Sequence, residues 1–222
     1  MNTYPSNVVR TQTGVIASNR TLRNTYFLLA LTLLFSAVTA GVSMALQLPR
    51  PGVWLTLLGY FGLLFLTARF RNSGLGLAMV FALTGFMGYT LGPLLNAYLS
   101  LSNGPQLVMM ALAGTGVTFL ALSGYALVSR KDFSFMGSFL MVGILVAFFG
   151  GLGAYFFELS GLALAVSAMF VLLMAGLILY ETSNIIHGGE TNYVMATVTL
   201  YVAIYNLFAS LLHLLGVFTN QE

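Results

Sequence analysis

The sequence predicts an all-α integral membrane protein, built as a bundle of seven transmembrane helices. Of its 222 residues, 59% are hydrophobic and only 6% are charged, with a mean hydropathy of +0.94. A soluble domain would carry about 25% charged residues. The apolar residues also form seven separate stretches, and about 20 residues suffice for one helix to cross a bilayer.

The first four spans are separated by short segments that contain proline, glycine or basic residues. The segment 48–52 ends the first span, and 102–105 ends the third. The second stretch is the shortest, so this span either includes Pro51 and Gly52 or lies where the bilayer is thinner. The expected spans are residues 24–46, 53–68, 75–98 and 106–128.

The last three spans follow the basic pair Arg130 and Lys131. The sixth and seventh are divided by a short polar turn that includes His187 and Glu190. Since no connection is long enough to hold a soluble catalytic or nucleotide-binding domain, any activity belongs to the bundle or to the ends of the chain. The expected spans are residues 134–157, 161–186 and 193–218.

Both ends of the chain lie outside the seven-helix domain, residues 24–218. Residues 1–23 are polar and contain no acidic residue, so they bury too little apolar surface to fold alone. We expect them to form a flexible cytoplasmic tail. Residues 219–222 are expected to form a short external tail.

The basic residues set the orientation, because Lys and Arg in short loops stay on the cytoplasmic side of a membrane. They lie before the first span, between the second and third, and between the fourth and fifth, whereas the other side receives only Arg50. The N terminus is therefore predicted to be cytoplasmic and the C terminus to lie outside. No basic cluster is long enough to follow a nucleic-acid backbone, so the net charge of +3 indicates no nucleic-acid partner.

Small residues at four-residue spacing predict close helix packing. Gly88 and Gly92 have this spacing in the third span, and Gly143, Ala147 and Gly151 have it in the fifth. Packing within one subunit is favoured over a dimer interface, and the oligomeric state stays open.

The seventh span carries a polar stripe. At about 100° per residue, its polar residues fall within an arc of about 60°. Such a face must turn away from lipid, so other helices should enclose it or it should border a hydrated cavity. The alternative is that these groups only form hydrogen bonds that pack helices together. The stripe consists of Thr199, Asn206, Ser210 and His213.

Glu181 is a lone carboxyl in an apolar span, where a charged group costs about 2.5 kcal/mol or more. It lies about 8 Å from the cytoplasmic end of its span, close enough to exchange protons with the cytoplasm. A pH-sensing group and a structural acid that hydrogen-bonds to Tyr201 or Thr199 are equally good interpretations. Asn184 lies one turn away on nearly the same face, so the candidate pH-sensing or packing site consists of Glu181, Asn184, Tyr201 and Asn206.

Common catalytic sites are not supported by the residues present. An intramembrane aspartyl protease needs two facing carboxylates, but the only aspartate, Asp132, lies in a loop. Ser123 and His213 come nearest to the Ser and His pair of an intramembrane serine protease, but the glycine expected two residues before the serine is missing. The histidines and carboxylates are scattered over both sides, so we expect no metal site, no cofactor and no catalytic residue. The absence of cysteine excludes disulfides.

Four runs of residues carry a family resemblance: Leu22–Leu29, Leu83–Phe86 leading to Gly92–Pro93, Glu181–Tyr193 and Leu200–Phe208. Together they resemble the Bax inhibitor-1 family, specifically its bacterial YccA branch. The resemblance implies a bundle with the seventh helix at its centre. Many members carry an acidic residue in each of the last two spans, a pair proposed to sense pH and to gate a calcium leak. Glu181 matches the first position, and Ala203 occupies the second.

For the YccA branch, the resemblance implies a non-enzymatic protein of the bacterial inner membrane, with its C terminus in the periplasm. It would restrain FtsH, a membrane-anchored ATP-dependent protease, and meet the FtsH associates HflK and HflC. It would act as a slow substrate and inhibitor, with residues 1–23 as the handle. The alternative is a pH-sensitive cation (calcium) leak channel or transporter, which is weakened because Ala203 can neither share a proton nor help to bind a cation.

Overall fold

Seven α-helices make up the fold. The computed structural model describes residues 6–219, with side chains from Ser18 onward, and no strand occurs in this range. All seven helices are long and apolar enough to cross a membrane, so the predicted fold class is confirmed. The helices are α1 (Ser6–Ala45), α2 (Val53–Phe70), α3 (Gly74–Leu99), α4 (Gly104–Ser129), α5 (Met136–Phe156), α6 (Ser160–Ile186) and α7 (Tyr193–Thr219).

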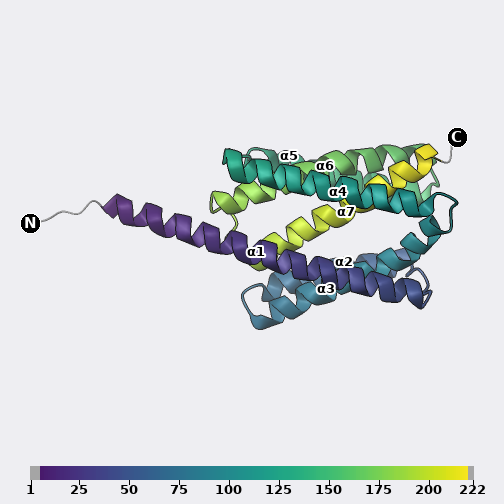
Figure 1. The fold of residues 1–222 in the computed structure, drawn as a ribbon, viewed down its shortest axis with the longest axis horizontal. Helices are drawn as coiled ribbons and strands as arrows, with labels where there is room; N and C mark the ends of the chain where they lie inside the picture. The colour runs from purple at the N-terminus through teal and green to yellow at the C-terminus, as the bar shows by residue number, and fades with distance from the viewer. Residues whose placement is uncertain (1–5, 220–222) are drawn as a thin grey trace, which may run out of the picture.

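α1 begins well before the first predicted span. The stretch of α1 that is apolar enough to cross a membrane lies within Ser18–Ala45, and the helix continues back to Ser6, so that α1 projects beyond the rest of the bundle (Figure 1). No proline interrupts this stretch, and an established helix extends readily by one hydrogen bond per residue. Much of the predicted tail is therefore helical. Its flexibility stays a prediction, and residues 1–5 and 220–222 lie outside the described residues.

α7 lies at the centre, between two groups of three helices. Figure 1 shows α1–α3 on one side and α4–α6 on the other, with α7 running obliquely between them. α7 contacts α1, α3, α4 and α6, and it contributes residues to all three hydrophobic clusters of the core. In its most apolar stretch 44% of residues are buried, against 6% in α2. The predicted central position of this helix is confirmed.

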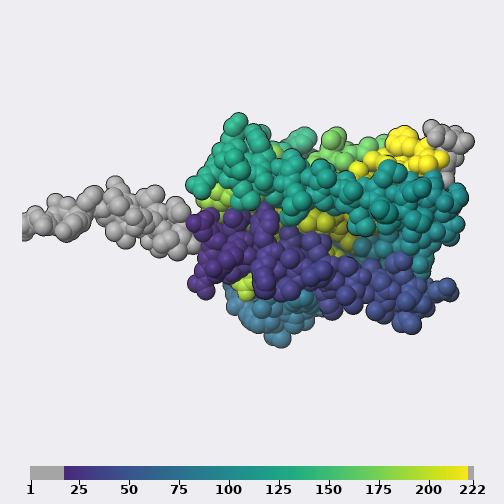
Figure 2. Space-filling view, viewed as in Figure 1, coloured from purple at the N-terminus to yellow at the C-terminus, as the bar shows by residue number. Residues whose placement is uncertain are grey.

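Two cavities flank α7 where the two groups of helices meet. One, of about 420 Å³, lies between α1, α3, α4 and α7. In Figure 2, α7 is visible in the seam between α1 and α4. The other cavity, of about 530 Å³, lies between α2, α3, α5, α6 and α7. Tyr205 lines both of them.

Hydrogen bonds bring four parts of the chain together at one end of the bundle, which we call the N-terminal face. These parts are α1 around Ser18 and the α2–α3, α4–α5 and α6–α7 connections. The Lys and Arg residues of the described spans and loops belong to this face, apart from Arg50 in the α1–α2 connection.

The glycines at four-residue spacing pack against other helices of the same chain. A Cβ on Gly88 would collide with the Ser36 carbonyl and the Thr39 hydroxyl of α1, and a Cβ on Gly92 would collide with Ser43. Likewise, a Cβ on Gly143 would lie 2.6 Å from Leu173 of α6. These contacts account for the glycines without a second subunit.

Gly88→Ala should destabilise the bundle by about 1–3 kcal/mol, because the extra methyl group forces α1 and α3 apart. The measurement is the free energy of unfolding in detergent, followed by circular dichroism. Gly62→Ala is the matched control, since nothing lies within 4 Å of a Cβ at Gly62. Equal stability of the two variants would contradict the close approach of α1 and α3.

Candidate functional site

Glu181 and Asn184 lie together at the N-terminal face, as expected from their spacing. Glu181 is buried, and the Asn184 side chain lies beside its carboxyl group. The Asn184 Oδ1 atom in turn rests against Gly189, where a Cβ would overlap it. α7 contains no acidic residue, and Ala203 is fully buried in an apolar cluster with Ile178. Glu181 therefore has no carboxyl partner on α7.

Tyr201 does not join Glu181 and Asn184. Its hydroxyl lies 2.6 Å from Ser36 Oγ on α1 and donates to the Thr84 carbonyl on α3 at 3.2 Å. The Thr199 hydroxyl donates to Met195 O within α7. The interpretation of Glu181 as a structural acid bonded to Tyr201 or Thr199 does not hold, because these two residues bond to other helices or within α7.

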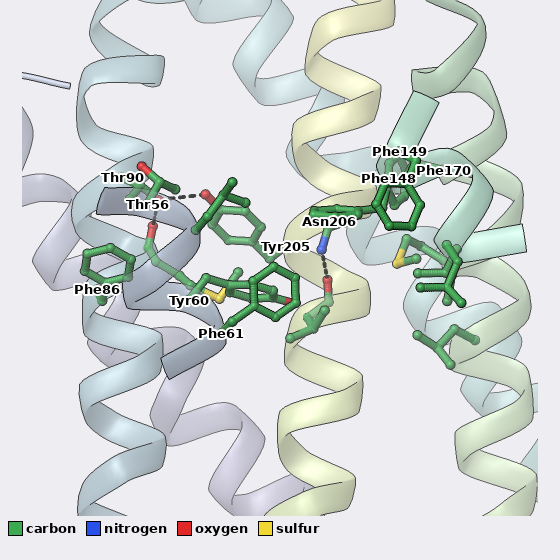
Figure 3. Close-up of a pocket in the computed structure, with 17 residues that line it drawn as sticks. Thr56, Tyr60, Phe61, Phe86, Thr90, Phe148, Phe149, Phe170, Tyr205 and Asn206 are labelled. Carbon is green, nitrogen blue, oxygen red and sulfur yellow. Dashed lines mark hydrogen bonds between the residues drawn. The ribbon is translucent and has the colours of Figure 1, made fainter. Parts of the chain in front are cut away.

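Asn206 lies apart from the other three candidates, at the 530 Å³ cavity. Its Nδ2 donates to Val202 O within α7 at 2.9 Å. Figure 3 shows this bond running along α7, while Tyr205 points toward Thr90. The Tyr205 hydroxyl lies 2.8 Å from Thr90 Oγ1. The four candidate residues thus occupy three places and do not form one site.

The predicted stripe of α7 makes few bonds to other helices. Ser210 is buried, and His213 Nδ1 lies 2.7 Å from Ser167 Oγ on α6. Ser123 instead pairs with Thr182 at 3.3 Å. Ser123 and His213 therefore have different partners and do not converge as a serine protease pair would.

The α6–α7 turn, residues 187–192, and the last turn of α6 form the most connected polar region. Ser183 Oγ donates to Lys131 O and accepts from Phe133 N, both at 3.0 Å. The ring nitrogens of His187 lie 2.8 Å from Ser183 O and 3.1 Å from Arg130 O. These bonds fix the end of α6 to the α4–α5 connection.

Asn192 connects the same turn to the α2–α3 connection. Its Oδ1 accepts from the backbone N–H groups of Val194 and Met195 and caps α7, as Asn does at many helix starts. Its Nδ2 donates to Asn72 Oδ1 at 2.7 Å and to Arg71 O at 3.2 Å. One side chain therefore starts α7 and holds α2 and α3 against it.

α1 reaches the turn as well. Ser18 Oγ lies 2.9 Å from both Ile185 O and Ile186 O, the last carbonyls of α6. Thr21 Oγ1 donates to Thr191 O at 3.3 Å, and the Tyr26 hydroxyl lies 3.2 Å from Thr182 Oγ1. All of the chain segments that meet at the N-terminal face are thus tied to the end of α6 or to the α6–α7 turn.

The polar side chains of this region bond to backbone atoms of neighbouring connections and to one another. No group of three or more His, Cys, Asp or Glu side chains that could hold a metal occurs in the described part of the chain. Asp132 is exposed, and hydrogen bonds from Ser134, together with the charge of His187, hold the pKa of its carboxyl below the usual value. We identify the α6–α7 turn and its partners as the candidate functional site.

Sequence reasoning missed Ser18, Ser36, Thr90 and Asn192 as bonding residues. Asn192 had a detectable signal, since an Asn directly before an apolar helix is a typical N-cap. The tyrosines of α7 offered another, because a buried tyrosine hydroxyl usually finds a partner. The identity of that partner depends on how the helices cross, which the sequence does not show.

Tyr201→Phe should lower the free energy of unfolding by about 1 kcal/mol, because it removes a buried hydrogen-bonding group between α1, α3 and α7. Unfolding in detergent measures the change. Tyr155→Phe on the exposed surface of α5 serves as the control and should leave the stability unchanged. If Tyr201→Phe is as stable as the parent, the Ser36–Tyr201–Thr84 contacts do not hold α7.

Comparison with known proteins places this architecture in a family. The model of the family described as "Inhibitor of apoptosis-promoting Bax1" matches residues 18–220. The chain is 54% identical over 205 residues to the "Modulator of FtsH protease YccA" of Escherichia coli strain K12, covering 92% of this chain and 93% of that protein. The "Inner membrane protein YccA" of Escherichia coli O6:H1 matches equally well.

An uncharacterized protein of Pseudomonas aeruginosa is 56% identical over 196 residues, 88% of each chain. The family match spans all seven stretches that can cross a membrane, together with the α6–α7 turn. The chain therefore belongs to the family of the inhibitor of apoptosis-promoting Bax1, the Bax inhibitor-1 family that its motifs resemble.

Proposed function

We propose that the protein is a non-enzymatic modulator of an FtsH-type protease in the bacterial inner membrane, acting as a slow substrate and inhibitor. The relatives named as an FtsH modulator and as an inner membrane protein support this role. The separation of Ser123 from His213 and the bonding of the polar residues to one another support a non-enzymatic role.

The proposed orientation puts the N-terminal face in the cytoplasm and the C terminus in the periplasm. This face carries Arg20, Arg23, Arg69, Arg71 and the pair at 130–131, whereas the opposite side has only Arg50. Basic residues in short segments stay on the cytoplasmic side. The α6–α7 turn would then face the compartment in which an ATP-driven protease works.

The projection of α1 beyond the bundle carries the proposal (Figure 1). A protease that pulls its substrate into a chamber needs an end of the chain that it can reach, and the N-terminal part of α1 stands clear of the other helices. Isolated helices of this length are marginal in water, so residues 6–17 can unwind at little cost. We propose that residues 1–17 are the handle.

The packing behind the handle accounts for slow processing. From Ser18 onward α1 packs along α3 and contacts α6 and α7. Pulling α1 out of the membrane therefore breaks the bundle rather than one peripheral helix. HflK and HflC, which the family resemblance links to FtsH, would meet the protein within the same assembly. Glu181 has a packing role in this proposal.

Removal of residues 1–17 should abolish degradation by FtsH and leave the bundle folded, because the stretch of α1 that is apolar enough to cross a membrane lies within Ser18–Ala45. The measurement is the rate of loss of the full-length chain in proteoliposomes with FtsH and ATP, with circular dichroism as the test of folding. A variant with residues 2–17 in scrambled order controls for length and should still be degraded. Normal degradation of the truncated chain would show that the handle lies elsewhere.

A calcium leak is the competing function, and its test is the Glu181→Gln substitution. Because Glu181 has no acidic partner on α7, we expect equal calcium flux in empty liposomes and in liposomes with the parent or the variant. Flux is measured with a trapped calcium dye at several pH values. Flux that exceeds the empty vesicles and changes with Glu181→Gln would favour a channel.

A further inference from the structure

The entry of α1 into the bundle coincides with the C-terminal end of α6. The last four carbonyls of a helix have no partner within it. Here the Ser18 hydroxyl lies 2.9 Å from two of them, Ile185 O and Ile186 O, and Thr21 reaches Thr191 O in the following turn. Both contacts join backbone of the α6–α7 turn region to side chains at the point where α1 leaves the bundle.

The turn is itself anchored on both sides, so it cannot follow α1 freely. Ser183 and His187 hold it to the α4–α5 connection, and Asn192 holds it to Asn72 in the α2–α3 connection. A displacement of the turn would break these bonds as well. Force applied to α1 at Ser18 is therefore shared among all the connections at this face.

The order of the contacts along α1 decides which of them bear a pull first. Among the residues whose side chains are described, the first from the N-terminal side are Ser18 and Thr21. Thr25 O, which accepts from Thr197 Oγ1 of α7 at 3.3 Å, and Tyr26, whose hydroxyl lies 3.2 Å from Thr182 Oγ1, follow within about 12 Å of Ser18. Ser36, which contacts Tyr201 at 2.6 Å, comes about 27 Å beyond Ser18 along the helix. When the N terminus is pulled, the bonds of α1 to the α6–α7 turn region therefore bear the force before its buried contacts with α3 and α7.

We propose that the α6–α7 turn is a mechanical clamp on α1, which delays extraction of the chain from its N-terminal end. The clamp rests on the proposed function for its biological use, since a slow substrate must resist the protease that pulls it. The clamp can be tested without FtsH. It predicts that resistance of the chain to unfolding under force depends on the direction of pull and on the hydroxyls of Ser18 and Thr21.

The test is a single-molecule pulling experiment on the full chain in bicelles, with force applied either to the N terminus or to the C terminus. The variants are Ser18→Ala, Thr21→Val and the double substitution. Thr56→Val is the matched control, because the Thr56 hydroxyl bonds only to Gly52 O near the start of α2. Unfolding in detergent is measured alongside.

The double variant should unfold about fivefold faster than the parent under a pull on the N terminus, as expected for the loss of about one net hydrogen bond. Under a pull on the C terminus it should match the parent, and Thr56→Val should match it in both directions. An unchanged rate under the N-terminal pull would overturn the clamp. So would equal acceleration in both directions, since that indicates general destabilisation.

Degradation by FtsH separates the clamp from the proposed function. If both hold, the double variant is degraded about fivefold faster than the parent, in line with its faster unfolding. If the N-terminal pull shows the clamp but neither chain is degraded by FtsH, the clamp stands and the proposed function fails.

Discussion

The absence of water inside the membrane is the constraint on which the structure depends. A polar group in hydrocarbon must find its partner within the protein, and the bundle meets this demand mainly in two places. Inside the bundle it is met by the tyrosines on α7, which bond to α1 and α3. At the N-terminal face it is met by Ser183 in the last turn of α6, whose hydroxyl bonds to backbone atoms of the α4–α5 connection. Thr25 Oγ1 is the one fully buried side-chain oxygen without a partner among the described residues.

The same constraint explains why α7 is central. Its polar residues exclude it from a lipid-facing position, whereas α2, in whose most apolar stretch only 6% of residues are buried, remains outside. Small residues complete the arrangement, since Gly88 and Gly92 let α3 approach α1 closely enough for the hydroxyls of α1 to reach neighbouring helices. Hydrogen bonding between helices therefore depends on close packing in this bundle, because short side chains can bond across helices only where the backbones lie close together.

The sequence predicts the positions of the membrane spans well, because a span needs only a sufficiently long apolar stretch. The helix of α1 reaches back to Ser6, well before the predicted span, because a polar helix that projects from a bundle has no apolar signal. The spacing of Glu181 and Asn184 was sufficient to place them together, as both belong to one helix. Tyr201 and Asn206 were assigned to the same site and lie elsewhere, because their partners depend on helix crossings that no local pattern encodes. The α6–α7 turn was visible as a run of polar residues and as part of the run Glu181–Tyr193 that carries the family resemblance, but its partners were not.

The mid-depth of the bundle and its N-terminal face differ in how firmly they join the two groups of helices. Cavities of about 530 and 420 Å³ lie on the two sides of α7, and both are lined mostly by apolar side chains. At these depths cohesion between α1–α3 and α4–α6 depends largely on α7. At the N-terminal face, in contrast, Ser18, Ser183, His187 and Asn192 join both groups to one short turn. A pull that enters through α1 therefore meets the bundle where its two halves are most directly bonded.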